Sequence, residues 1–177
     1  EKDSFAVSDV NVKERKKRPD PPLTTSKLQQ EAANRFGYPS SKTMNIAQIL
    51  YEGIDIGKDR VGLITYMRTD SVRVSDVALK EVRDLIKYSF GNDYLPKEPN
   101  TYSNKKGSQD AHEAIRPTSL TRTPDSMKEY LNTEQFKLYS LIYNTFVASQ
   151  MTDAVYERTT AEIAGKKSGS IFRAIAE

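Results

Sequence analysis

A change in the spacing of apolar residues limits the fold more than any other feature of this sequence. Apolar residues alternate weakly with polar ones over residues 4–18 and again from about 159 to 175, which is typical of strands. Between these stretches apolar residues recur three or four positions apart, the spacing that gives a helix one buried face. The pattern predicts an α+β fold that is mainly α, in which a helical domain is inserted into a truncated β-sheet domain whose strands lie at both ends of the chain.

The boundaries of the two expected domains follow from where this spacing changes. Residues 1–24 and 152–177 are expected to supply the strands, and residues 25–151 the helical domain. Prolines crowd the segment 19–22, and because proline lacks a backbone N–H they disfavour regular structure there. The chain begins at Glu1 without a Met and ends within an alternating pattern, so we expect a piece of a longer polypeptide.

The apolar spacing also predicts the individual helices of the central region. They are expected over residues 26–36, 41–52, 76–89 and 134–149, with a short helix beginning at Pro124. Ser26 and Gln29 have the spacing of a capping box, and Gly37 and Ser75 are placed to end the first helix and to begin the third.

Three other segments are expected to be extended or irregular. Residues 61–66 form a short apolar run rich in β-branched residues, which predicts a strand or an extended segment. Residues 92–109 are polar and are expected to form a long surface loop. The glycine-containing stretch 165–169 separates two alternating segments and predicts a hairpin.

Composition excludes several classes of protein. The chain of 177 residues has no cysteine, so it has no disulfide, no thiolate metal site and no thiol nucleophile, and a reducing intracellular setting fits. No stretch approaches the roughly 18 consecutive apolar residues of a membrane span. The formal charge of +3 is mildly basic, which is compatible with a polyanionic partner but does not require one.

The first stretch that can carry chemistry is Gly62–Ser71, with the sequence GLITYMRTDS. In an extended segment Tyr66 and Arg68 point to the same face, so both can meet one phosphate. The tyrosine oxygen is a poor nucleophile while protonated, since its usual pKa is about 10. A neighbouring arginine favours the phenolate and binds phosphoryl oxygens as a planar fork. The chain has 10 tyrosines, and the alternative is that Tyr66 only packs at the end of a strand.

The second stretch is Ala111–Thr118, with the sequence AHEAIRPT. His112 is the only histidine, which excludes a multi-histidine metal site, and its usual pKa of about 6.5 allows it to hold a phosphate or pass a proton. We expect Arg116 to lie one helical turn away and to add a phosphate contact. The alternative is a capped helix end with an ion pair between His112 and Glu113.

Together the two stretches resemble the active-site motif pair of the type IA DNA topoisomerases, and the bacterial topoisomerase I branch fits best. The segments 21–32 (PPLTTSKLQQEA) and 44–53 (MNIAQILYEG) are also similar to this family. The resemblance covers most of residues 19–160.

The resemblance implies an activity and a set of site residues. Tyr66 would attack single-stranded DNA and form a 5′-phosphotyrosine link, after which another strand passes, the break is resealed and negative supercoils are relaxed. Because the covalent link conserves the bond energy, no ATP is needed. Tyr66, Arg68 and His112 would be the catalytic residues. The DNA-binding residues would be Arg68, His112, Arg116 and Thr65, and Asp70 would orient Arg68 or the strand.

The resemblance also implies what this chain lacks. In the family a separate acidic Toprim domain binds Mg²⁺ through a Glu and an Asp-x-Asp set, and no two Asp residues of this chain are two positions apart. We therefore expect no metal ligands here, dependence on the Toprim and remaining domains of the same polypeptide, and no activity of the chain alone. The strands would belong to a gate or hinge domain, and the basic run 13–18 is a candidate DNA contact or a solvated strand. The expected location is the cytoplasm, at the nucleoid, and no membrane is involved.

Three other interpretations remain open. The chain could be a non-catalytic nucleic-acid-binding helical module, a piece of a different tyrosine strand transferase, or a protein-interaction domain in which Tyr66 packs. The topoisomerase interpretation predicts that Tyr66, Arg68 and His112 lie together on a face open to solvent, because the acidic domain that would cover them is not in this chain.

Overall fold

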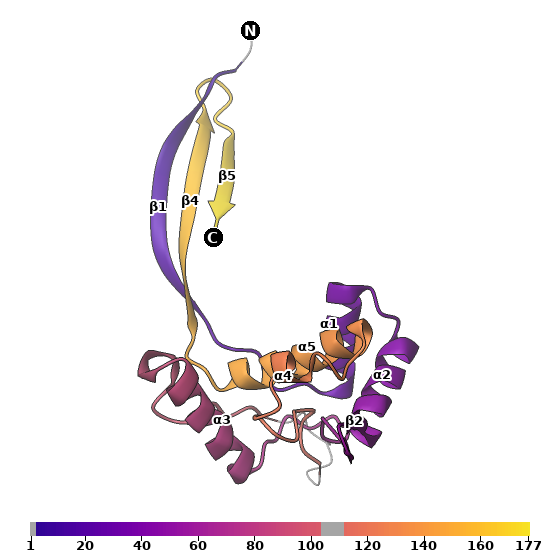
Figure 1. The fold of residues 1–177 in the computed structure, drawn as a ribbon. Helices are drawn as coiled ribbons and strands as arrows, with labels where there is room; N and C mark the ends of the chain where they lie inside the picture. Colours follow the sequence, from indigo (N-terminus) through magenta and orange to yellow (C-terminus); the bar gives the residue numbers. More distant parts are fainter. Residues whose placement is uncertain (1–2, 104–111) are drawn as a thin grey trace. The chain divides into compact units, whose positions relative to one another are not determined.

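A computed structural model describes residues 3–103 and 112–177 (Figure 1). The fold is α+β, and the chain divides into two compact units. The first unit consists of Glu1–Arg18 and Asp153–Glu177, and the second of Pro19–Thr152. Residues 19–24, which the sequence analysis grouped with the strands, belong to the helical unit. The buried Leu23 explains this, because it forms a bridge with Ile115 and joins the helical core.

The first unit is an antiparallel sheet in the strand order β1-β4-β5. The strands are β1 (Phe5–Lys17), β4 (Ala154–Gly165) and β5 (Ile171–Ala176). The expected hairpin is present between β4 and β5, and β1 pairs with β4 from Phe5↔Gly165 to Lys17↔Ala154, with an irregularity between Val7 and Asp9. Every side chain of β1 is exposed. The sheet therefore buries little apolar surface on its own.

The second unit is helical and contains all of the expected helices. They are α1 (Thr25–Phe36), α2 (Ser40–Glu52), α3 (Asp76–Ser89), a 3₁₀ turn η1 (Asn92–Tyr94), α4 (Pro124–Met127) and α5 (Thr133–Ser149). The longest, α5, packs against α1, α2 and α4 (Figure 1). Its fully buried residues Leu138, Ile142 and Phe146 form the centre of the core, together with Leu28 of α1 and Leu50 of α2. None of the described helices is long and apolar enough to cross a membrane.

The helix ends agree with the sequence in part. Gly37 ends α1 with φ of 68°, in the left-handed region that glycine adopts without strain, as expected. The capping box expected at Ser26 is wrong, because α1 begins at Thr25 and the Thr24 hydroxyl accepts the hydrogen bond from Lys27 N–H. The capping box of this protein lies instead at the start of α5, where the side chains of Asn132 and Gln135 each accept a backbone N–H of the other.

A small hairpin that the sequence analysis did not predict separates α2 from the tyrosine segment. Its strands are β2 (Ile54–Ile56) and β3 (Asp59–Val61), joined through Gly57 at φ of 66°. The chain then continues as an extended segment, of which only Ile64 forms a bridge, with Pro117. Leu63, Ile64 and Met67 are buried, so this segment runs through the core of the helical unit.

The first part of the expected long loop is held to the end of α5. The side-chain amide of Asn100 donates to the backbone carbonyls of Ser149 and Met151, at 3.0 and 2.8 Å. The hydroxyl of Tyr102 lies 2.9 Å from the Pro19 carbonyl and 2.8 Å from that of Ser149, within hydrogen-bonding distance of both. This hydroxyl therefore connects the two ends of the helical unit. The rest of the loop, 104–109, lies outside the described residues.

Candidate active site

Exposure alternates along the extended segment 65–70. Thr65, Met67 and Thr69 point inward, whereas Tyr66, Arg68 and Asp70 are exposed. Tyr66 retains 40% of its accessible surface although its neighbour Met67 is fully buried. Tyr66 and Arg68 are thus both open to solvent, although the chain bends at Met67 and Arg68 and does not form a regular strand there.

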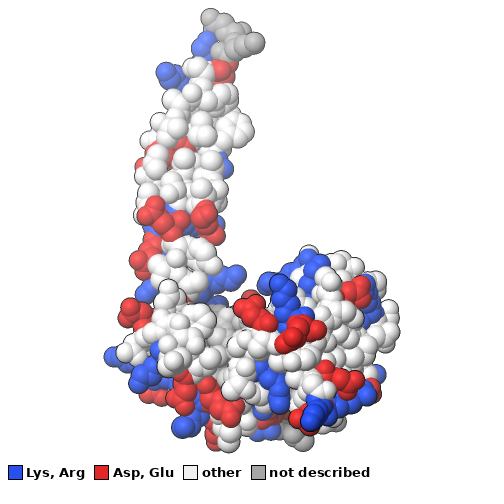
Figure 2. Space-filling model, in the orientation of Figure 1, with Lys and Arg blue, Asp and Glu red and all other residues white. Residues whose placement is uncertain are grey.

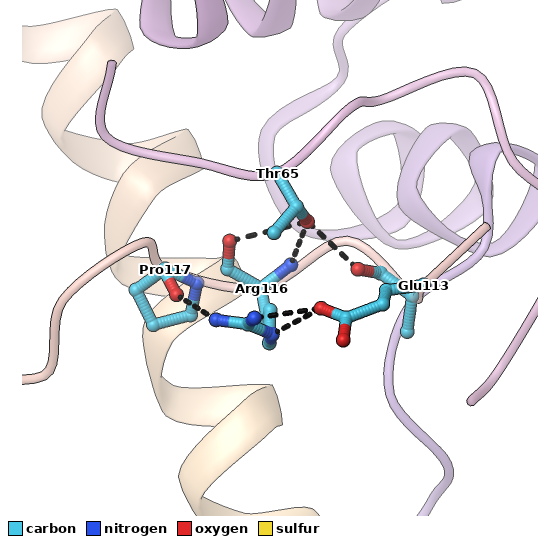
Figure 3. A network of polar contacts seen from close by, with 5 residues as sticks. Thr65, Glu113, Arg116 and Pro117 are labelled. Carbon is cyan, nitrogen blue, oxygen red and sulfur yellow. Dashed lines mark hydrogen bonds and ion pairs between the residues drawn. The ribbon is translucent and has the colours of Figure 1, made fainter. Parts of the chain in front are cut away.

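The inward-pointing Thr65 joins the tyrosine segment to the segment of the second motif. Its N–H donates to the Arg116 carbonyl at 2.9 Å, and its hydroxyl donates to the Ala114 carbonyl at 2.7 Å. The same hydroxyl oxygen accepts the Arg116 N–H at 3.0 Å (Figure 3). The Thr65 side chain is therefore engaged within the protein.

Arg116 is likewise held by internal contacts. Its guanidinium makes a two-pronged contact with the Glu113 carboxylate, at 2.6 and 2.9 Å, and donates to the Pro117 carbonyl at 3.0 Å (Figure 3). The side chains of Arg116 and Glu113 are 15% and 20% exposed. Residues 112–117 are extended, so the expectation that Arg116 lies one helical turn from His112 is wrong. The bridges to Leu23 and Ile64 hold this segment in an extended form.

Ser75 is the N-cap residue of α3, as expected, but its side chain contacts Glu113. Ser75 precedes α3, but its hydroxyl makes no cap bond to the helix and instead donates to the Glu113 carboxylate, as does the Ser75 N–H. Burial raises the pKa of Glu113, but the hydrogen bonds from Ser75 and Arg116 and the charge of Arg116 outweigh it, so the net pKa is lowered. The ion pair of this segment joins Glu113 to Arg116, and not to His112 as the packing alternative proposed.

Two other rings contact the ring of Tyr66. The His112 ring lies 6.0 Å from the Tyr66 ring, and the Tyr51 ring, at the end of α2, contacts it edge to face at 5.5 Å. Among the described residues the Tyr66 hydroxyl has no hydrogen-bond partner. The ring is therefore oriented by its two neighbours, while its oxygen is free to meet a ligand.

An open hollow of about 530 Å³ adjoins the side chain of His112. It is lined by Thr25, Ser26 and Gln29 of α1 and by Arg68, Thr69, Asp70 and His112. Arg68 has no ion pair within the described part of the chain, so its charge is available to an anion in the hollow. Acidic and basic side chains are interspersed over the face shown in Figure 2, without a continuous basic groove. No group of three or more potential metal ligands occurs among the described residues.

The structure brings together part of the predicted set and adds to it. Arg68, His112 and Asp70 line one hollow and Tyr66 contacts His112, whereas Thr65 and Arg116 have their polar groups in internal contacts. Sequence reasoning did not single out Thr25 or Tyr51. Tyr51 lies in the last turn of α2 and is 40% exposed. Its contact with the Tyr66 ring is seen only in the fold, because no sequence signal marks it.

The half-exposed Tyr66 contacts His112, which lines one hollow with Arg68, an arrangement compatible with a class of protein that acts on phosphate groups. Comparison with known proteins agrees, since residues 1–176 match the model of a family described as DNA topoisomerase. The chain belongs to this family, in its bacterial type IA class.

Individual relatives are similar over nearly the whole chain. DNA topoisomerase 1 of Treponema pallidum is 57% identical over 157 residues, 89% of this chain and 21% of the relative. DNA topoisomerase 1 of Rickettsia felis is 47% identical over 172 residues, 97% of this chain and 22% of the relative. The structure of full-length topoisomerase I from Thermotoga maritima, 43% identical, matches with a TM-score of 0.80 over 98% of this chain and 28% of that one. The chain thus spans about a fifth of the length of these curated relatives.

Proposed function

We propose that this chain carries the nucleophile of a type IA topoisomerase that cleaves one DNA strand, passes another strand and reseals the break. The observation that supports this most directly is the position of Tyr66, whose exposed ring lies 6.0 Å from the His112 ring beside the hollow that Arg68 and His112 line. A buried tyrosine could not reach a phosphodiester, and an isolated one would have no cation to neutralise the phosphate.

In the proposed reaction the deprotonated Tyr66 oxygen attacks the scissile phosphorus. A bond between phosphorus and the Tyr66 oxygen forms as the bond to the 3′ oxygen breaks, and that oxygen takes up a proton and leaves as a 3′-hydroxyl. Arg68 binds the phosphoryl oxygens and neutralises the charge that develops on them. His112 holds the backbone of the same strand. Attack by the 3′-hydroxyl on the phosphotyrosine reverses these steps, so relaxation of negative supercoils needs no ATP.

Two residues expected to bind DNA receive a different role. The hydroxyl of Thr65 and the guanidinium of Arg116 are already hydrogen-bonded within the protein, at 2.6 to 3.0 Å. We propose that they keep the segments of Tyr66 and His112 in register, and that Arg68 and His112 contact the single strand. Asp70 lines the hollow and is proposed to orient Arg68 or the strand.

The Mg²⁺ of the family does not fit the described residues, which contain no group of three potential ligands. We propose that an acidic Toprim domain elsewhere in the full-length polypeptide binds it, that the chain alone is inactive, and that the complete enzyme acts on the cytoplasmic nucleoid.

The test uses the full-length polypeptide and a single-stranded oligonucleotide labelled at its 3′ end. After denaturation, label should remain on the wild-type protein and be absent from Tyr66→Phe, which identifies both the nucleophile and the 5′-phosphotyrosine polarity. Label on both proteins would show that another residue attacks. No label on either, with DNA binding retained, would favour the non-catalytic nucleic-acid-binding helical module.

A further inference from the structure

Helix α1 is joined to the tyrosine segment through the side chain of its first residue, Thr25. The Thr25 hydroxyl donates to the Met67 and Thr69 carbonyls, at 2.7 and 3.0 Å, and its oxygen accepts the Thr69 N–H at 2.8 Å. The Thr25 N–H adds a bond of 2.9 Å to the Thr69 carbonyl. One side chain thus contacts the Met67 carbonyl and both the N–H and the carbonyl of Thr69.

These contacts lie on both sides of Arg68. The Met67 carbonyl belongs to the peptide group that precedes Arg68, and the Thr69 N–H belongs to the peptide group that follows it. The two peptide planes meet at the Arg68 α-carbon, so holding both of them sets the backbone dihedral angles of Arg68. Those angles determine the direction in which its side chain leaves the backbone.

The backbone anchor is the contact that can orient Arg68 among the described residues. The Arg68 side chain is exposed and, within the described residues, has no ion pair that would orient it. The residues beside it, Met67 and Thr69, are 1% and 7% exposed and point into the core. Thr25 lies at the edge of the same hollow that Arg68 lines, so the anchor is adjacent to the proposed phosphate position.

We propose that Thr25 is a positioning residue that aims Arg68 at the scissile phosphate. The proposal rests on the function proposed above for Tyr66 and Arg68. Thr25 does not itself touch the reacting atoms. Its effect is indirect, because an arginine displaced by about 1 Å loses much of its ability to stabilise the transition state.

The test compares Thr25→Val, which keeps the shape but removes the hydroxyl, with Thr25→Ser, which keeps the hydroxyl. Single-turnover formation of the covalent complex is measured in the full-length protein with the 3′-labelled oligonucleotide, and DNA affinity is measured separately. We expect Thr25→Val to slow covalent-complex formation by about ten- to a hundredfold. The dissociation constant should change by less than about threefold, because most backbone contacts to DNA remain. Thr25→Ser should restore the rate.

A double-mutant cycle separates positioning from general destabilisation. If Thr25 acts through Arg68, Thr25→Val should cause no further loss in an Arg68→Ala background. Asn132→Ala serves as the control, because it removes the capping box of α5 outside the hollow and should leave the rate unchanged. If Thr25→Val does not fold, as judged by circular dichroism, Thr25→Ala replaces it, since alanine favours a helix.

The outcomes distinguish this inference from the function on which it rests. A wild-type rate in Thr25→Val, or an equal loss with and without Arg68, refutes the positioning role while Tyr66→Phe remains inactive. Label retained by Tyr66→Phe would overturn the proposed function, and the positioning role with it.

Discussion

Gly62 lies where the C-terminal end of α2 meets the tyrosine segment, and substituting it tests whether this contact positions Tyr66. A β-carbon at Gly62 would lie 2.6 Å from the Tyr51 carbonyl oxygen, closer than such atoms approach in folded proteins. The obstacle is backbone, so no side chain can rotate away. In Gly62→Ala, α2 and the tyrosine segment must separate by about 0.8 Å for this 2.6 Å distance to reach the 3.4 Å of ordinary van der Waals contact.

The expected cost combines three effects. Overpacking of this kind costs about 1–3 kcal/mol. The separation also weakens the hydrogen bond from Leu63 N–H to the Leu50 carbonyl, which is 2.7 Å long and worth about 1 kcal/mol. Against this, alanine reduces the entropy of the unfolded chain and recovers about 0.4–1 kcal/mol. We expect Gly62→Ala to lower the free energy of unfolding by about 1–3 kcal/mol.

Gly57→Ala is the matched control. Gly57 has φ of 66° and open space around it, so alanine there is strained by about 1–2 kcal/mol but pushes against nothing. Urea unfolding followed by circular dichroism at about 222 nm reports mainly on the helical unit, since all the helices belong to it. Both variants should be less stable, but only Gly62→Ala should slow labelling of Tyr66 in the full-length protein. Equal rates for the two variants, or wild-type stability of Gly62→Ala, would refute the reasoning.

Other substitutions test the remaining contacts of the site. Glu113→Gln should lower the free energy of unfolding by about 1–2 kcal/mol at neutral pH, because it removes a carboxylate held by charge-assisted hydrogen bonds. Since the folded state lowers the pKa of Glu113 below its usual 4.5, this stabilisation is present above that pH and is lost as the pH falls through the folded pKa. The free energies of unfolding of the wild type and of Glu113→Gln should therefore converge as the pH falls, and urea unfolding at a series of pH values measures this. Tyr51→Leu should slow labelling of Tyr66 by up to about tenfold, because it removes the edge-to-face contact and the loss of that contact's free energy corresponds to such a factor in rate. Tyr51→Phe keeps the ring and should not slow labelling. Tyr66→Phe should change the free energy of unfolding by less than about 0.5 kcal/mol, because its exposed hydroxyl makes no hydrogen bond within the described residues, and chemical denaturation checks this.

The elements that the sequence predicted well are those whose pattern is local. The helices with an apolar face, such as α3 and α5, carry their period in the sequence, and Gly37 marks the end of α1 by its chemistry alone. Strand β4 begins at Ala154, before the alternating stretch expected from about residue 159, because its pairing with β1 extends to Lys17. The β2–β3 hairpin was missed, since strands of three residues carry no periodicity.

The errors concern segments whose conformation depends on distant partners. Residues 112–117 have a composition compatible with a helix, but the bridges to Leu23 and Ile64 hold them extended. Ser26 has the spacing of a cap, but the anchor of Thr25 on Thr69 starts the helix earlier. The motifs singled out Tyr66, Arg68 and His112 as candidate site residues. The contacts of Thr25 with the tyrosine segment and of Tyr51 with Tyr66 have no sequence signal, because they depend on the fold.

The Tyr102 hydroxyl, which connects Pro19 to Ser149, bears on the order in which the chain folds. Strand β1 pairs only with β4, and the whole helical unit lies between them in the sequence, so direct pairing would close a long and entropically costly loop. The backbone hydrogen bonds within each helix and within the β4–β5 hairpin join residues close in sequence, so they form without that cost. A folded helical unit holds its two ends together through Tyr102 and so shortens the effective loop. We therefore expect strand β1 to be the last element to join the fold.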